Sequence, residues 1–166
     1  MNPRNLPHLI TAANLAPSDR ETLLAGARAL HRAAVAGALP RLLEGKNIGL
    51  LCATPDAEAA ALFERAAGEL GARVARISPG LSPASGDESL RRTARTLGRL
   101  YDAIECQGLA GELLQQLRAE AGVPVYDGIA CTRHPSAALV AELGDEGAAA
   151  DSRRHVLQAL LLCTMG

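Results

Sequence analysis

Short apolar runs alternate with longer amphipathic stretches along the chain. The apolar runs have the length of buried strands and lie at residues 47–52, 73–77, 102–106 and 123–126. The stretches beside them have the apolar spacing of helices and lie at residues 18–37, 57–70, 88–100, 108–121, 134–143 and 151–163. Because alternating strands and helices form βαβ units, we predict an α/β fold of three layers (α/β/α), with a four-stranded parallel sheet and helices on both faces.

Local signals mark where several of these elements begin or end. Ser18 and Glu21 have the spacing of a capping box, so we expect Ser18 to be the N-cap of the first helix. Gly71 directly follows the second helix and is the residue type that most often ends one. Pro124 places the last strand at a sheet edge or makes it begin at the proline. The Gly-, Pro- and Ser-rich segment 78–87 is long for such a connection, and connections of this length are often functional.

Composition and charge narrow the classes of function. The 166 residues suffice for one domain with its own core, and 48% of them are hydrophobic. The net charge of -1, without a basic stripe interleaved with aromatics, gives no reason to expect nucleic acid as a partner. No apolar run is long enough to span a bilayer, and the amino terminus lacks the apolar region of a secretion signal. We therefore expect no membrane association.

The cysteines predict reduced thiols rather than a disulfide framework. Cys52, Cys106, Cys131 and Cys163 lie in or beside apolar runs and show no paired spacing, which favours a cytoplasmic protein. Cys131 and His134 have the spacing of half a zinc site, but the sequence offers no second half. We expect no metal and no other cofactor.

The turn between the first strand and the second helix is the first candidate site. At the carboxyl end of a strand in an open α/β sheet, the free amides and dipole of the following helix attract anions. Here the turn carries Asp56 and Glu58 and no Lys or Arg, so its backbone favours a phosphate while its side chains repel one. Two alternatives stay open. The carboxylates can simply stabilise the helix N-terminus, or they can bind a metal or a cationic ligand.

Short motifs occur along nearly the whole chain in one specific order. They are Leu42-Leu43-Glu44-Gly45-Lys46, Phe63-Glu64, Glu69-Leu70-Gly71-Ala72, Glu88-Ser89-Leu90 with Thr93-Ala94-Arg95, Leu100-Tyr101-Asp102-Ala103-Ile104, Ala121-Gly122-Val123-Pro124-Val125 and His134-Pro135. In this order they resemble the carbamoyl-phosphate domain of the aspartate/ornithine carbamoyltransferase family. Residues 153–161 are similar to the C-terminal helix of ornithine carbamoyltransferases, which packs back on that domain.

The resemblance implies an unusual domain organisation. In the family, a whole amino-acid-binding domain lies between the His-Pro motif and the C-terminal helix. We expect a carbamoyl-phosphate-domain-like unit over residues 1–143 and a linker over 144–150 that replaces the second domain. A C-terminal helix over 151–166 would then pack back on the first unit.

The same resemblance implies that much of the family's binding chemistry is lost. The family's phosphate loop, Ser-Thr-Arg-Thr-Arg, falls on residues 56–60, where Glu58 occupies an arginine position. All three hydroxyl side chains and both guanidinium groups of this loop are therefore missing. The family's arginine after the third strand is Gln107 here, and the glutamine after its His-Pro pair is Ala137. An aspartate of the family's Glu-Ser-x-x-Asp-Thr run is Arg92.

Two family positions are retained. His134 corresponds to a residue that contacts the carbamoyl oxygen, and Arg153 to a C-terminal arginine that reaches carbamoyl phosphate. Each also has a structural alternative: His134 can bond the backbone at a helix start, and Arg153 with Arg154 can be a solvated surface pair. The vestigial ligand site implied by the resemblance comprises Asp56, Ala57, Glu58, Ala59, Gln107, His134 and Arg153.

Two functional hypotheses follow. The first is a catalytically inactive carbamoyltransferase-like protein that acts as a binding, assembly or regulatory module. The resemblance implies a homotrimer for it, or mixed assembly with a full-length carbamoyltransferase. The second is a residual binder of carbamoyl phosphate or another small molecule, or a carbamoyltransferase subunit completed by a partner chain. If Glu58 points into the cleft, a cationic or neutral ligand is favoured over a phosphate. We expect the basic face formed by Arg91, Arg92, Arg95 and Arg99 to be solvated or paired with acids.

Overall fold

The computed structural model describes residues 15–53, 57–78, 80–82, 84, 86–144 and 149–166. Its elements, in chain order, are α1 (Pro17–Val35), β1 (Asn47–Cys52), α2 (Ala57–Glu69), β2 (Arg73–Ile77), α3 (Asp87–Leu100), β3 (Ala103–Gln107), α4 (Gly111–Ala121), β4 (Val125–Asp127), the 3-10 helix η3 (Pro135–Glu142) and α5 (Ala149–Met165). No helix in these residues is both long and apolar enough to cross a membrane.

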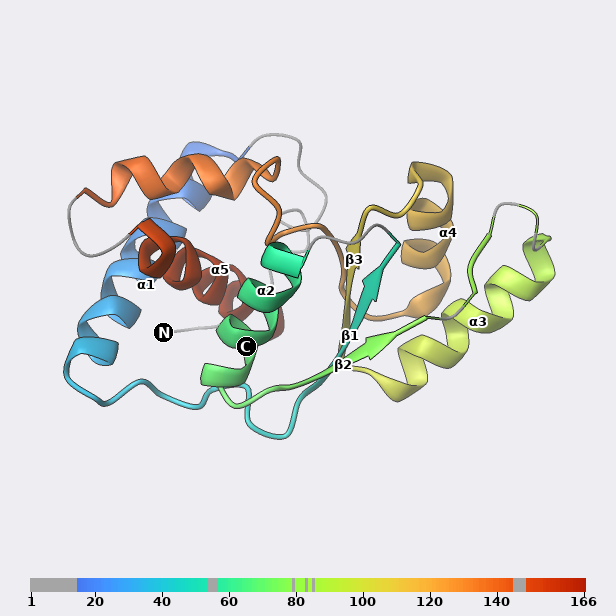
Figure 1. Ribbon diagram of the computed structural model, residues 1–166, viewed down its shortest axis with the longest axis horizontal. Helices are drawn as coiled ribbons and strands as arrows, with labels where there is room; N and C mark the ends of the chain where they lie inside the picture. Colours follow the sequence, from blue (N-terminus) through green and yellow to red (C-terminus); the bar gives the residue numbers. More distant parts are fainter. Residues whose placement is uncertain (1–14, 54–56, 79, 83, 85, 145–148) are drawn as a thin grey trace.

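The predicted α/β architecture is confirmed. The four strands form one parallel sheet in the order β2-β1-β3-β4, so β1 and β3 are central. Helices α1, α2 and α5 cover one face, and α3 and α4 cover the other (Figure 1). As Pro124 predicted, β4 is an edge strand, and it begins at Val125, directly after the proline.

Some local predictions were wrong. The N-cap of α1 is Ala16 rather than Ser18, because Pro17 occupies the first turn and no side chain caps the helix. The segment after His134 is a 3-10 helix, so its residues form no regular α-helix. The last helix begins at Ala149, two residues before the expected Asp151.

Two apolar cores hold the layers together. The larger core, between the sheet and helices α1, α2 and α5, contains the fully buried Phe63 and Tyr126. The smaller core lies under α3 and α4 and includes Leu97 and Leu117. Helix α5 is enclosed on several sides, because it packs against α1, α2 and η3 and 12 of its 17 residues are buried. It is therefore an integral part of the larger core.

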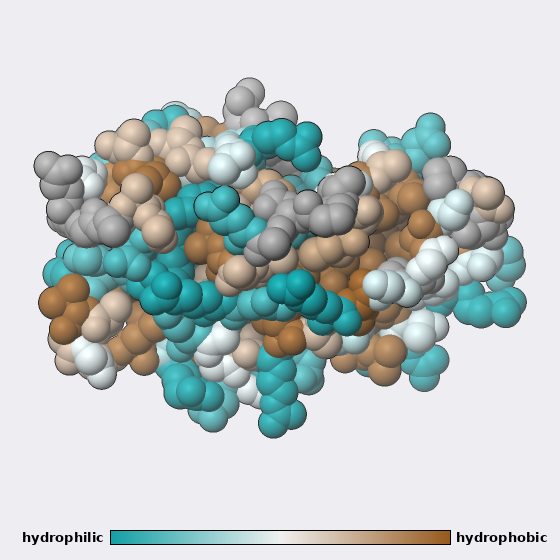
Figure 2. Space-filling model, in the orientation of Figure 1, coloured by the Kyte–Doolittle hydropathy of each residue, from teal (hydrophilic) through white to brown (hydrophobic). Residues whose placement is uncertain are grey.

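Several charged side chains at the surface form ion pairs with a residue of opposite charge. On the face shown in Figure 2, hydrophilic residues cross the region of α1 and α2 as a band. Arg76 of β2 forms an ion pair with Glu64 of α2. On α3, both Arg91 and Arg95 pair with Glu120 of α4, so that part of the basic helix face is paired with an acid, as expected.

One close approach between helices makes a testable prediction. A Cβ atom added at Gly98 of α3 would lie 1.7 Å from the backbone oxygen of Ala121, at the end of α4. We expect Gly98→Ala to lower the free energy of unfolding by about 1–3 kcal/mol, because the two helices must move apart. The matched control is Gly68→Ala in α2, where a Cβ meets nothing within 4 Å. That change should stabilise by roughly 0.5–1 kcal/mol through helix propensity alone. Chemical denaturation measures both, and equal effects of the two changes would contradict the packing.

Candidate functional site

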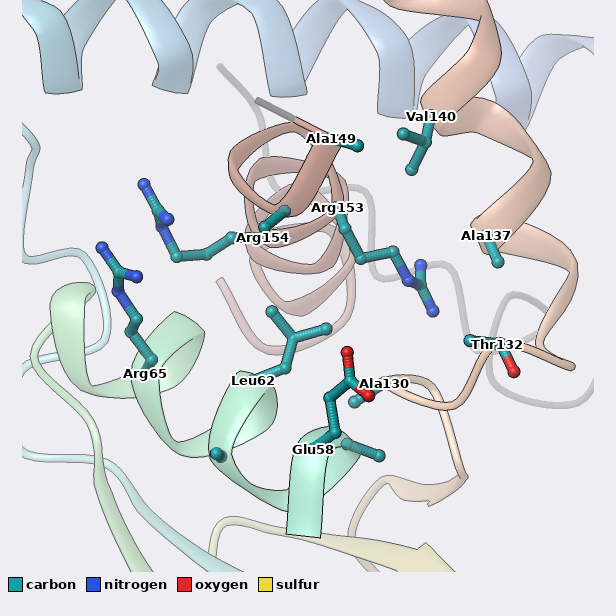
Figure 3. A pocket seen from close by; sticks show the side chains of 13 residues that line it. Glu58, Leu62, Arg65, Ala130, Thr132, Ala137, Val140, Ala149, Arg153 and Arg154 are labelled. Atoms are coloured by element: carbon teal, nitrogen blue, oxygen red, sulfur yellow. The ribbon is translucent and has the colours of Figure 1, made fainter. Parts of the chain in front are cut away.

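A pocket of about 680 Å³ lies beside the N-terminal part of α2. Helix α2 lines it with residues at helical spacing, including Glu58, Leu62 and Arg65. Ala137 and Val140 of η3 form the opposite wall (Figure 3). The N-terminal turns of α5 and residues 130–132 of the loop after β4 complete the lining. Most of the wall is apolar, with a few charged groups at its margin.

Glu58 directs its carboxylate into this pocket (Figure 3). The side chain is exposed to solvent, and no ion pair of Glu58 is found within the described residues. An acid without a partner therefore faces the space at the start of α2. This is the orientation that disfavours an anion at the helix N-terminus.

Arg153 reaches the same pocket from α5, but its guanidinium is bound to the fold. Nη2 donates to the carbonyl oxygens of Ile129 at 2.9 Å and Cys131 at 3.0 Å, and Nη1 donates to Oγ of Ser136 at 3.1 Å. The residue is only 9% exposed. The structural alternative of a solvated surface pair is therefore wrong, because Arg153 and Arg154 are both buried. The side chain ties together α5, η3 and the loop after β4.

His134 acts as the N-cap of η3. Its Nδ1 accepts a hydrogen bond from the amide of Ser136 at 3.3 Å and lies 2.8 Å from the Ser136 hydroxyl. Burial, together with the nearby charge of Arg153, lowers the pKa of His134 to about 4. The ring is thus neutral near pH 7, with its proton on Nε2, since Nδ1 is an acceptor. The structural alternative for His134, bonding at a helix start, is what the geometry shows.

Gln107 lies inside the protein, at the end of β3. It is 1% exposed, its Nε2 lies 3.5 Å from Oε1 of Glu105, and its Oε1 accepts a weak hydrogen bond from the Cys52 thiol. Neither Gln107 nor His134 is among the described residues that line the pocket. The sequence-derived site is therefore only partly brought together.

Glu105 is the feature that sequence reasoning missed. It lies in the middle of β3 with no exposed surface, and its Oε2 has no hydrogen-bond partner among the described groups. Burial raises the pKa of this carboxyl to about 8, although the amides of Ile129 and Ala130 oppose the shift. The sequence did contain a signal for this buried acid, because Glu105 is the one charged residue in the apolar run 103–106 that predicts a buried strand.

Of the other predicted site residues, Ala59 is buried at the pocket wall. Asp56 lies outside the described residues, and Ala57 is described only as the first residue of α2. No group of three or more His, Cys, Asp or Glu side chains converges as metal ligands within the described ranges.

Comparison with known proteins decides the family. The family profile described as "Aspartate/ornithine carbamoyltransferase, carbamoyl-P binding domain" matches residues 7–143. The chain belongs to the aspartate/ornithine carbamoyltransferase family. An ornithine carbamoyltransferase of Actinobacillus pleuropneumoniae is 39% identical over 132 residues, which are 80% of this chain and 40% of the relative. A catabolic ornithine carbamoyltransferase of Burkholderia mallei is 44% identical over 118 residues, 70% of this chain and 35% of the relative.

Solved structures agree with this assignment. The ornithine carbamoyltransferase of Pyrococcus furiosus superposes with a TM-score of 0.66 at 26% identity, covering 85% of this chain and 44% of that structure. Aspartate transcarbamoylase of Trypanosoma cruzi, solved with aspartate and phosphate, gives a TM-score of 0.65 at 25% identity, covering 81% and 43%. The chain thus spans less than half the length of these carbamoyltransferases.

The contacts of Arg153 predict a structural role in this family member. Arg153→Ala removes three hydrogen bonds, and the carbonyl oxygen of Cys131 then keeps only the amide of His134 as a donor. We expect a loss of roughly 2–4 kcal/mol in the free energy of unfolding. Arg133→Ala is the matched control, because Arg133 is exposed and its loss should change stability by less than about 0.5 kcal/mol. Urea denaturation compares the two, and similar stabilities would contradict the structural role.

The buried Glu105 predicts a particular dependence of stability on pH. The folded carboxyl keeps its proton to a pKa of about 8, whereas the unfolded one releases it near 4.5. Below pH 4.5 both states hold the proton, and the contribution of Glu105 to the free energy of unfolding is complete. Between pH 4.5 and 8 only the folded state holds the proton, so this contribution falls by about 1.4 kcal/mol per pH unit as the pH rises. Glu105→Gln keeps the shape and should lack this slope. Denaturation curves between pH 5 and 8 measure the difference, and parallel profiles for the two proteins would exclude a protonated Glu105.

Proposed function

We propose that this chain is a carbamoyltransferase-like protein without catalytic activity, which acts as a binding, assembly or regulatory module. The observation that carries the proposal is the orientation of Glu58. Its carboxylate lines the pocket at a position where the family's phosphate loop has an arginine. The side chain that would have to attract a phosphate instead repels it.

The magnitude of this reversal supports the proposal. At an effective dielectric constant of ~20, two unit charges about 4 Å apart interact by about 4 kcal/mol. Replacing attraction by repulsion therefore changes phosphate binding by up to about 8 kcal/mol, or roughly six powers of ten in affinity. Because Glu58 is exposed, solvent screening reduces this change in binding free energy. A loss of only about 3 kcal/mol would still weaken phosphate binding roughly a hundredfold.

The retained family residues do not compensate for the reversal. Arg153 directs three hydrogen bonds to protein groups, and His134 uses Nδ1 to cap η3. The resemblance implies that the family's reaction needs positive charge on the tetrahedral centre and on the leaving phosphate. The neutral Gln107 and Ala137 supply none where the family has polar or cationic ligands.

A second candidate function is small-molecule binding in the same pocket. Leu62 and Val140 offer apolar walls, and Glu58 offers a negative charge without a partner in the described chain. These features favour a cationic or neutral ligand. In the same alternative, a partner chain could complete the site.

For the assembly role, the family resemblance favours a trimer or mixed assembly with a full-length carbamoyltransferase. Sedimentation that finds only monomers, with and without such a partner, would exclude assembly.

Calorimetric titration with carbamoyl phosphate tests the main proposal. We expect no saturable binding at millimolar ligand, because Glu58 faces the site and Arg153 is engaged. Glu58→Gln removes the repulsion and should raise any residual affinity. The control Glu64→Gln changes an acid of α2 that pairs with Arg76 and should have no effect. Micromolar binding by the unmodified protein would refute the proposal.

A further inference from the structure

Two histidines meet where α5 packs on α1. The rings of His31 and His155 lie edge to face, with centroids 5.3 Å apart and an angle of 75° between their planes. His155 is 2% exposed and His31 is half-buried. The two helices that carry them lie side by side (Figure 1). The ring pair is thus part of the contact that holds the C-terminal helix in place.

His155 is buried without the hydrogen bonds that a buried imidazole ordinarily has. Neither Nδ1 nor Nε2 has a partner within the described residues. Beside the rings is a cavity of only about 10 Å³, bounded in part by Arg28, Leu143 and Ser152. This volume is at the lower limit for a single water molecule. The surroundings therefore suit a neutral ring and offer little solvation to a protonated one.

The neighbouring charges do not favour a protonated His155. They come from every helix around the contact: Arg28 of α1, Glu69 of α2, Glu142 of η3, and Asp151 and Arg154 of α5. Of the acids, Glu69 and Asp151 already form ion pairs with Arg154, and Glu142 pairs with Arg20. No acid in the described surroundings is thus left unpaired to stabilise an imidazolium.

We propose that His31 and His155 form a proton-sensitive contact, which holds α5 on α1 while His155 is neutral and weakens when it is protonated. The inference concerns the docking of α5 and goes beyond the proposed function. Because α5 carries Arg153, weaker docking also loosens the loop around Ile129 and Cys131. That loop and the first turns of α5 form walls of the pocket. Acidification would thereby open the pocket.

The direction of the effect follows from linkage. Burial lowers the pKa of His155, and the charges of Arg154 and His31 lower it further. In the released helix the ring returns to its ordinary pKa, near 6.5. The docked helix is therefore fully favoured above about pH 6.5, and docking weakens as pH falls below that value, because the released state binds the extra proton.

Hydrogen exchange measured by mass spectrometry tests the proposal on the full chain. Peptides from residues 149–166 report on α5, and peptides from 87–121 report on α3 and α4 as an internal control. After correction for intrinsic exchange, we expect opening of α5 to increase by up to roughly tenfold between pH 7.5 and 5.5, because pH 5.5 lies one unit below the ordinary pKa of the released ring. The control peptides should keep their protection.

His155→Leu identifies the titrating group. Leucine fills the site without a proton to gain and without a hydrogen bond to lose, so the response of α5 to pH should disappear. His31→Leu is the second variant. It removes a neighbour whose charge lowers the pKa of His155, so it should reduce the response of α5 to pH. This variant also tests the proposal if His155→Leu does not fold. The proposal is overturned by equal α5 protection at both pH values or by an unchanged response in either variant. Simultaneous loss of protection in α5 and the control peptides, which indicates global acid unfolding, overturns it equally.

Discussion

The position of α5 depends on the hydrogen bonds of one buried arginine. A guanidinium that leaves water needs acceptors for its charge, and Arg153 finds them in two backbone carbonyls after β4 and in the hydroxyl of Ser136. These bonds join α5 to the loop after β4 and to η3, which lie 17 to 24 residues earlier in the chain. Apolar residues of α5 such as Leu157 and Leu160 are fully buried, and directional hydrogen bonds fix how the helix is oriented. Arg153 supplies such bonds on the side of the pocket, and Gln158 bonds to Ala66 and Glu69 on the side of α2.

The same bonds explain how a carbamoyltransferase family member can keep the family's residues and use them differently. His134 caps a helix, Arg153 holds a loop, and the residue at the family's third-strand arginine position, Gln107, is buried at the end of the central strand β3 beside Glu105. Each of these groups forms its hydrogen bonds with the protein. Glu58 also lines the pocket, and its carboxylate has no ion-pair partner among the described residues.

Much of the fold could be predicted from the sequence, because each strand is a short apolar run and each long helix has periodic apolar residues. The start of α1 could not be predicted, because Pro17 and Ser18 are both typical of a helix start and the helix begins at Pro17. The 3-10 helix η3 could not be predicted, because local propensity does not distinguish an α-helix from a 3-10 helix. For the candidate site, the sequence indicated which residues to consider but not which groups their side chains contact. Whether Arg153 faces solvent or a carbonyl, and whether two distant histidines meet, depends on tertiary neighbours that no local pattern specifies.

Whether Arg153 serves the fold or binds a phosphate can be measured at the side chain itself. Nitrogen-15 NMR of the Arg153 guanidinium reports whether its Nη protons are held in hydrogen bonds. The account predicts slowly exchanging Nη protons, whose chemical shifts do not change when carbamoyl phosphate is added at millimolar concentration. Rapid rotation of the free guanidinium, or saturable shifts on addition of the ligand, would contradict the account and indicate a functional anion site.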